Sequence, residues 1–241
     1  MNWHFVSDLH LFARRSLAAQ FQSELERVVK ESNTVVLGGD IFDFRWSTRG
    51  DLEQSVTEAI GWLADLIAQN EDCRFFYLLG NHDCNETFMT QLADLSEQRS
   101  NLEWHETHWR VDDTVFLHGD VADKMTLPAE LLRHRDRWQS ESIQPKSGFR
   151  QNLYDVALWL RLHKVVGQIV HRPWAVAQRV LYYLNALDLG PANGVSKVYF
   201  GHTHAPLSGY EYDGMKFFNG GAPLRGVRFR ILPVDTSGFT S

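Results

Sequence analysis

The stretch Leu37-Gly38-Gly39-Asp40-Ile41-Phe42-Asp43 decides how the rest of the chain folds around it. It continues the apolar run Thr34 to Leu37, which predicts a buried strand. Its two glycines end that strand and let the backbone approach another group closely. A carboxylate at the end of a buried strand is costly unless a cation meets it. We therefore interpret Asp40 as the bridge between two metal ions.

Four further predicted strand ends carry side chains that bind metals. They are Asp8-Leu9-His10, Gly80-Asn81-His82-Asp83, His118-Gly119-Asp120 and Gly201-His202-Thr203-His204. Residues two apart on an extended chain point to the same side, so the first and the last of these stretches can each present a pair of ligands. Carboxylate, imidazole and carboxamide together suit Mn, Fe or Zn better than Mg or Ca. We expect two divalent ions, with Mn²⁺ as the first choice and Fe or Zn as alternatives.

The composition is that of an ordinary globular protein. The chain has 241 residues, 44% hydrophobic residues and a formal net charge of −6. This charge gives no support for nucleic-acid binding, although bound metals would still allow an anionic substrate. Cys73 and Cys84 form no CxxC pattern, which argues against a disulfide framework or a thiolate metal site. Without an apolar signal stretch after Met1, we expect a cytoplasmic protein.

Strands and amphipathic helices alternate through the first hundred residues. Strands are predicted at 3–7, 34–37 and 74–79, and helices at 16–31, 51–69 and 87–98. This order favours an α/β core with parallel strands.

The second half of the chain has a different pattern. Short strands are predicted at 102–105, 108–111, 114–117, 197–200 and 227–233, with a hairpin across Asp213-Gly214. A mostly helical block lies between His118 and Gly201. We expect a single domain over residues 1–241, in the α/β (α+β) class, with two packed sheets flanked by helices and a helical insert at 126–189.

The order of the polar stretches resembles a known family. Asp-x-His, Gly-Asp-x-x-Asp, Gly-Asn-His-Asp, a lone His and Gly-His-x-His are similar to the five motifs of the calcineurin-like metallophosphoesterases. The resemblance implies a β-sandwich flanked by helices and a dinuclear, metal-dependent phosphohydrolase. It places Asp8, His10, Asp40 and His204 on one metal, and Asp40, Asn81, His118 and His202 on the other. It makes His82 the catalytic histidine and Asp83 the carboxylate that orients it.

The charge balance supports that implication. Two divalent ions against the carboxylates of Asp8 and Asp40 leave a positive site, which can accept a phosphate anion and neutralise charge in the transition state. His82 directly follows the expected ligand Asn81 and is placed to protonate the leaving oxygen or to stabilise it.

Several residues near the motifs have two open interpretations. Asp43 either contacts a ligand or His82, or caps a helix. Asp120 either supports the site or belongs to a turn. Arg14 and Arg45 are candidate contacts for a substrate phosphate, but a solvated loop is the more common outcome for such residues.

A helical insert at this place, with Asp-Leu-His-Leu at 8–11 and Gly-His-Thr-His-Ala-Pro at 201–206, is similar to the UDP-2,3-diacylglucosamine pyrophosphatase branch of the family. That branch implies a lipid-linked nucleotide substrate and peripheral membrane contact. The apolar faces at 158–170 and 176–187 exceed what one helix layer must bury, and basic residues lie between them. A helical cap with solvated charges is the alternative. The chain departs from the best-known members of the branch at one position, because they carry Arg where this chain has His82.

Three functions therefore stay open. The first is hydrolysis of a phosphoester or pyrophosphate bond, including that of a UDP-2,3-diacylglucosamine-like substrate. The second is a general phosphodiesterase or nucleotide hydrolase without lipid specificity. The third is a non-catalytic metal-binding scaffold. The presence of His82 and of all the expected ligands argues against this third function.

Overall fold

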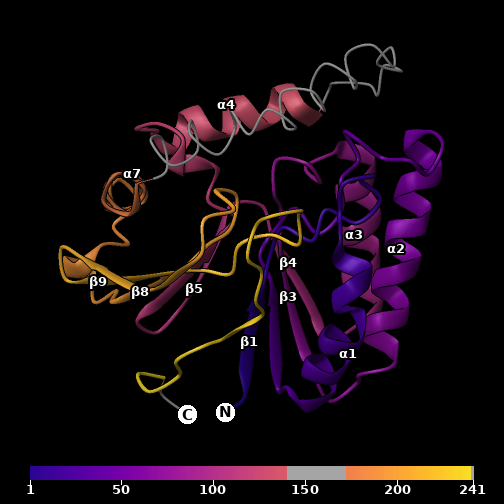
Figure 1. The fold of residues 1–241 in the computed structure, drawn as a ribbon, viewed down its shortest axis with the longest axis horizontal. Helices are drawn as coiled ribbons and strands as arrows, with labels where there is room; N and C mark the ends of the chain where they lie inside the picture. The colour runs from indigo at the N-terminus through magenta and orange to yellow at the C-terminus, as the bar shows by residue number, and fades with distance from the viewer. Residues whose placement is uncertain (140–171, 240–241) are drawn as a thin grey trace.

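A computed structural model of the chain describes residues 1–139 and 172–239. Two five-stranded sheets lie face to face, and helices cover their outer faces (Figure 1). Within the described residues, the predicted two-sheet sandwich of the α/β class is confirmed.

The first sheet is mainly parallel and has the strand order β10-β1-β2-β3-β4. Its strands are β1 (Trp3–Val6), β2 (Thr34–Leu37), β3 (Arg74–Leu78), β4 (Leu102–His105) and the antiparallel β10 (Leu232–Pro233). Its outer face carries the short 3-10 helix η1 (Ala18–Phe21) followed by α1 (Gln22–Glu31), and then α2 (Leu52–Ala68) and α3 (Glu86–Gln98). The helices bury residues such as Val29, Val56 and Leu92 against the sheet, as their apolar stripes predict.

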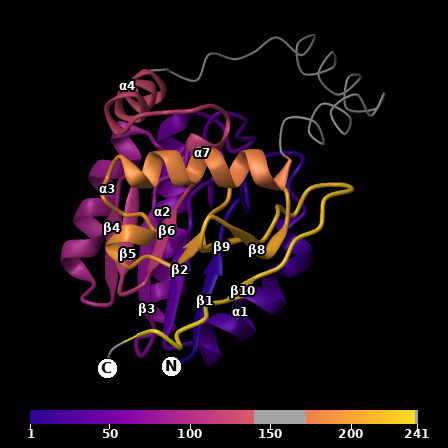
Figure 2. The ribbon, with the colours of Figure 1, turned by 90° about the vertical axis from the view of Figure 1, so that its left-hand side faces the viewer.

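The second sheet is mixed and has the order β5-β6-β7-β9-β8. Its strands are β5 (His108–Val111), β6 (Thr114–Leu117), β7 (Lys197–Tyr199), β8 (Leu207–Tyr212) and β9 (Met215–Asn219). β6, β7 and β9 run parallel, so β6 and β7 end at the same edge of the sheet. Helix α7 (Pro173–Asn185) lies along its outer face (Figure 2).

Aromatic side chains fill the space between the sheets. The ring of Phe116 lies 6.0 Å from Phe5 in the first sheet and 5.4 Å from Tyr199 in its own sheet. Trp109 stacks on Phe76 with ring centroids 3.7 Å apart. This packing fixes the two sheets relative to each other, and with them the loops at their shared edge.

The described ends of the insert pack on the sandwich. Helix α4 (Pro128–Gln139) opens it and α7 closes it, and the predicted apolar face at 158–170 lies outside the described residues. The face at 176–187 is not spare apolar surface, because Val176, Val180 and Leu184 are buried against the second sheet. The sequence predicted that the apolar face of α7 would be larger than the second sheet could cover. That prediction is wrong for α7, because the sheet buries this face.

Other differences from the predicted elements are small. The helix expected from residue 16 begins as η1, and the strand expected at 227–233 is reduced to its last two residues. Two more 3-10 turns, η2 (Asp120–Ala122) and η3 (Pro191–Asn193), follow β6 and α7. Across residues 1–139 and 172–239, no helix combines the length and the apolar character that crossing a bilayer requires.

Candidate metal centre

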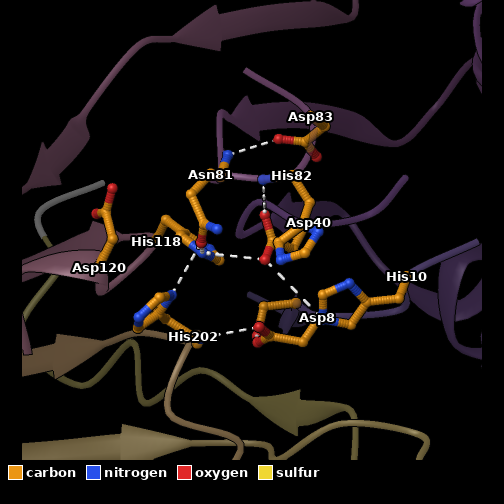
Figure 3. A network of polar contacts seen from close by, with 12 residues as sticks. Asp8, His10, Asp40, Asn81, His82, Asp83, His118, Asp120 and His202 are labelled. Atoms are coloured by element: carbon orange, nitrogen blue, oxygen red, sulfur yellow. Dashed lines mark hydrogen bonds and ion pairs between the residues drawn. The ribbon is translucent and has the colours of Figure 1, made fainter. Parts of the chain in front are cut away.

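Loops that follow five strands meet at one edge of the sandwich (Figure 3). β1, β2 and β3 of the first sheet lead into Asp8, Asp40 and Asn81, and β6 and β7 of the second lead into His118 and His202. With His10 and His204, all the ligands expected from the sequence are near one another.

The backbone at this edge is unusual. Asp8, His10, Asp40, His202 and His204 all have positive φ, at 56°, 46°, 51°, 63° and 52°. Side chains with a Cβ atom disfavour this region, and such strain clusters at functional sites. Hydrogen bonds between the loops hold it: the Asp8 amide donates to the Gly39 carbonyl at 3.0 Å, and the His10 amide to the Asp40 carbonyl at 2.9 Å.

Two glycines allow the loops to approach the carboxylates. A Cβ atom on Gly80 would lie 2.1 Å from Oδ1 of Asp40, and one on Gly201 would lie 2.1 Å from Oδ2 of Asp8. Both distances are too short for any side chain, so the motif glycines are required by the packing of the site.

The first ligand group consists of Asp8, His10 and His204, whose donor atoms all lie within 4.8 Å of one another. Nε2 of His204 lies 3.4 Å from Oδ1 of Asp8 and 3.1 Å from Nε2 of His10. Burial lowers the pKa of the His204 imidazole, which favours the neutral form that binds metals.

The second group consists of Asp40, His118 and His202, joined by Asn81. Oδ1 of Asn81 lies 3.1 Å from Nε2 of His118 and 2.9 Å from Nδ1 of His202. Oδ2 of Asp40 lies 3.4 Å from Nε2 of His118 and 3.9 Å from Nε2 of His10. Asp40 therefore stands between the two groups, where the sequence interpretation placed it.

The donor set fits two divalent cations. Imidazole nitrogens, carboxylate oxygens and a carboxamide oxygen converge here. Asp8, His10, Asp40 and His118 are buried, where unpaired charge is costly. Two of the ligand imidazoles also have a hydrogen-bond partner at their other nitrogen, as metal-binding histidines usually do. Nδ1 of His118 is 3.1 Å from the Gly38 carbonyl, and Nε2 of His202 is 3.0 Å from Asp123.

His82 lies beside the metal ligands with its Nδ1 atom 3.0 Å from Oδ1 of Asp43. Burial lowers its pKa, but the charges of Asp40 and Asp43 outweigh burial and raise the pKa to about 9. Both carboxylates thus favour the protonated form of the imidazole, and its side chain is still 20% exposed. A protonated, accessible imidazole at this position can act as a general acid.

The role predicted for Asp83 needs correction. Its Oδ1 accepts from the Gly80 amide at 2.6 Å, and its Oδ2 accepts from the Tyr77 hydroxyl at 2.6 Å and the Ile41 amide at 3.0 Å. Asp83 thus fixes the loops after β2 and β3, and the carboxylate beside His82 is Asp43. Asp43 caps no helix, because α2 has Asp51 as its N-cap.

Of the less certain candidates, Asp120 is buried and pairs with Arg135 of α4 rather than with a metal ligand. Nε and Nη2 of Arg135 each lie 3.2 Å from one of its carboxylate oxygens. Burial opposes the charged form, but Arg135 lowers the pKa of Asp120. Arg14 and Arg45 are exposed on the loops after His10 and Asp43, and their contact with a substrate stays a prediction.

Three residues at the site had not been expected from the sequence. Asp123 contacts His202, Arg135 anchors Asp120, and Tyr77 anchors Asp83. Tyr77 lies near the end of a predicted strand, three residues before the Gly-Asn-His-Asp motif, and this position is the sequence signal that points to it. Asp123 and Arg135 belong to no motif, and Arg135 is one of several arginines around 133–137.

Comparison with known proteins agrees with this geometry. The model of the calcineurin-like phosphoesterase family matches residues 1–206, which include all five motifs. A search of curated protein sequences gave no match. The chain therefore belongs to the calcineurin-like phosphoesterase family.

Proposed function

We propose that the protein is a hydrolase that uses two divalent metal ions, Mn²⁺ in the first instance, to cleave a phosphoester or pyrophosphate bond. The observation that supports this most directly is the position of Asp40 between two ligand groups, with His82 beside them. When bound, the ions supply the positive charge that draws electron density from a phosphoryl group.

The side chains of the chain supply the remaining functions. Asp40 holds the two ligand groups together and accepts the His82 amide at 2.8 Å, which fixes the backbone of the catalytic loop. Asp43 contacts Nδ1 of His82, so Nε2 is the atom that donates a proton to the leaving oxygen. Proton donation of this kind contributes about 10²- to 10⁴-fold to a rate.

The proposed substrate is a lipid-linked nucleotide of the UDP-2,3-diacylglucosamine type. Support comes from the motif resemblance and from exposed apolar side chains at the described ends of the insert, namely Met125, Leu127, Leu132, Trp174 and Tyr182. Such side chains suit peripheral contact with a membrane that carries the substrate. The presence of His82, where the best-known members of that branch have Arg, favours the second candidate, a phosphodiesterase or nucleotide hydrolase without lipid specificity.

Metal analysis and substrate turnover test the proposal together. We expect two Mn²⁺ ions per chain after reconstitution, and Asp40→Asn should weaken the binding of both. The protein should hydrolyse an aryl phosphodiester, and comparison with an acylated UDP-sugar, a nucleotide and a phosphomonoester identifies the substrate class. A protein that binds both ions but hydrolyses none of these compounds would be the scaffold, and the proposal would be wrong.

If the acylated substrate is not turned over while the aryl phosphodiester or the nucleotide is, the second candidate replaces the first.

A further inference from the structure

A short segment after β6 contacts both sides of the second ligand group. It starts at the ligand His118 and ends at Asp123, whose Oδ2 lies 3.0 Å from Nε2 of His202. That contact occupies one nitrogen of His202, so that Nδ1 faces Asn81. The segment thus carries one ligand and orients another.

Two arginines from the helices at the ends of the insert hold this segment. Arg135 of α4 is entirely buried and binds Asp120 through two parallel contacts of 3.2 Å, and its Nη1 donates to the Glu106 carbonyl. Nη1 of Arg179 in α7 donates to the Ala122 carbonyl at 2.9 Å. Bidentate pairing fixes the orientation of both partners more tightly than a single contact does.

We propose that Arg135 is a positioning residue for the metal centre, an inference that rests on the proposed function. Through Asp120 it fixes the segment that places His118 and Asp123. It also balances the charge of the buried Asp120 carboxylate, which stands two residues from His118. Helix α4 thereby sets the geometry of the second ligand group. This role does not depend on whether the insert contacts a substrate.

The test measures Mn²⁺ binding by the full-length protein, using calorimetry together with electron paramagnetic resonance. Arg135→Met should weaken one of the two binding steps about 10- to 100-fold, the usual effect of losing a group behind a metal ligand. The other step should stay within about twofold, and the spin coupling between paired Mn²⁺ ions should be lost. The matched control is Arg133→Met on the same helix, because Arg133 is exposed and bonds only its own helix at Ala129, as far as the described contacts show.

Asp123→Asn is the second variant, because the Asp123 side chain is 57% exposed and its replacement does not threaten folding. It should weaken the same binding step as Arg135→Met.

The outcomes separate the inference from the proposed function. If the unmodified protein binds fewer than two Mn²⁺ ions, the proposed function fails. If it binds two and a folded Arg135→Met binds them equally well with only a lower melting temperature, Arg135 is merely structural and the inference is overturned. If Arg135→Met does not fold, Asp123→Asn decides: unchanged Mn²⁺ binding overturns the inference, and loss of the same step supports it.

Discussion

Nδ1 of His82 lies 3.0 Å from Oδ1 of Asp43, while Asp83, the next residue in the sequence, bonds to Tyr77 and to two backbone amides. Two neighbouring carboxylates of the motifs thus have separate tasks. Asp43 lies against the imidazole that we propose as the general acid, and Asp83 holds the loop that carries this imidazole. The first three predictions follow from this division.

Asp43→Asn should lower kcat, because it removes the carboxylate beside Nδ1 of His82, which orients the ring and, with Asp40, favours its protonated form. We expect a loss of about 10- to 100-fold, smaller than the loss on removing the imidazole itself. Steady-state kinetics with an aryl phosphodiester measure it, and Mn²⁺ content is the control because Asp43 also lies 3.5 Å from His10. Unchanged kcat with both metals present would show that Asp43 does not act on His82.

His82→Ala should lower kcat by about 10²- to 10⁴-fold and leave the metal content near normal, since His82 supplies no expected ligand. The loss should shrink for substrates with good leaving groups, which need little protonation. A series of aryl phosphodiesters with different leaving-group pKa values measures this dependence. Equal losses across the series would leave electrostatic stabilisation, and not proton donation, as the role of His82.

Asp83→Asn should act on stability first. The Asp83 side chain is fully buried, and its oxygens accept from the Gly80 and Ile41 amides and from the Tyr77 hydroxyl. A carboxamide offers one acceptor oxygen and turns a donor toward donors, which costs about 1–3 kcal/mol per unsatisfied group. Urea denaturation should show this loss, and an unchanged midpoint would contradict it.

The candidate ligands named from the sequence lie together for a physical reason. Parallel strands end at a common edge, so polar residues after β1, β2 and β3 must lie close together, and the parallel pair β6 and β7 adds two more. Alternation and turn signals also located β2, β4, β5 and β6 correctly.

Roles that depend on the path of a loop could not be predicted in this way. Asp43 reaches His82 because the loops pair at Leu11 and Phe42, which turns the Asp43 side chain toward the site. Asp123 and Arg135 act through tertiary contacts across 79 and 15 residues of sequence. No local pattern records such a contact, and an arginine in a basic helix gives no sign that it will be buried.

A pH-dependent contribution to stability is expected at the other end of the sandwich. Nζ of Lys197, which is buried, lies 3.4 Å from Oδ2 of Asp113 and 3.5 Å from Oδ2 of Asp235. Burial raises the pKa of Asp113, but hydrogen bonds from Ser196 and Thr114 and the charge of Lys197 lower it overall. Hydrogen bonds from Ser237 are the main cause that lowers the pKa of Asp235.

Carboxyl groups with a depressed pKa stabilise the fold above their unfolded value of 3.8 and lose that contribution as the pH falls through the folded value. Lys197→Met should therefore destabilise the protein most near neutral pH, and the difference from the unmodified protein should shrink below pH 3.8. Urea denaturation across this pH range measures the difference. If the difference in unfolding free energy stays constant with pH, the carboxylates of Asp113 and Asp235 are not the groups through which Lys197 stabilises the fold.

Two glycine substitutions should have opposite effects. Gly61 lies inside α2 with no atom within 4 Å of an added Cβ, so Gly61→Ala should stabilise the fold by about 0.5–1 kcal/mol through the better helix propensity of alanine. Gly201→Ala would place a Cβ atom 2.1 Å from Oδ2 of Asp8 and 2.5 Å from Oγ of Ser7. The loops must then separate, which moves Asp8 away from His204.

We therefore expect Gly201→Ala to weaken Mn²⁺ binding at the group of Asp8, His10 and His204 and to lower activity, while Gly61→Ala leaves both unchanged. Calorimetric titration with Mn²⁺ and thermal unfolding of the two variants in parallel measure these effects. If the Gly201→Ala variant binds two ions as tightly as the unmodified protein does, the loops can separate without loss of metal affinity. The close approach of Gly201 to Asp8 would then not be what positions the carboxylate.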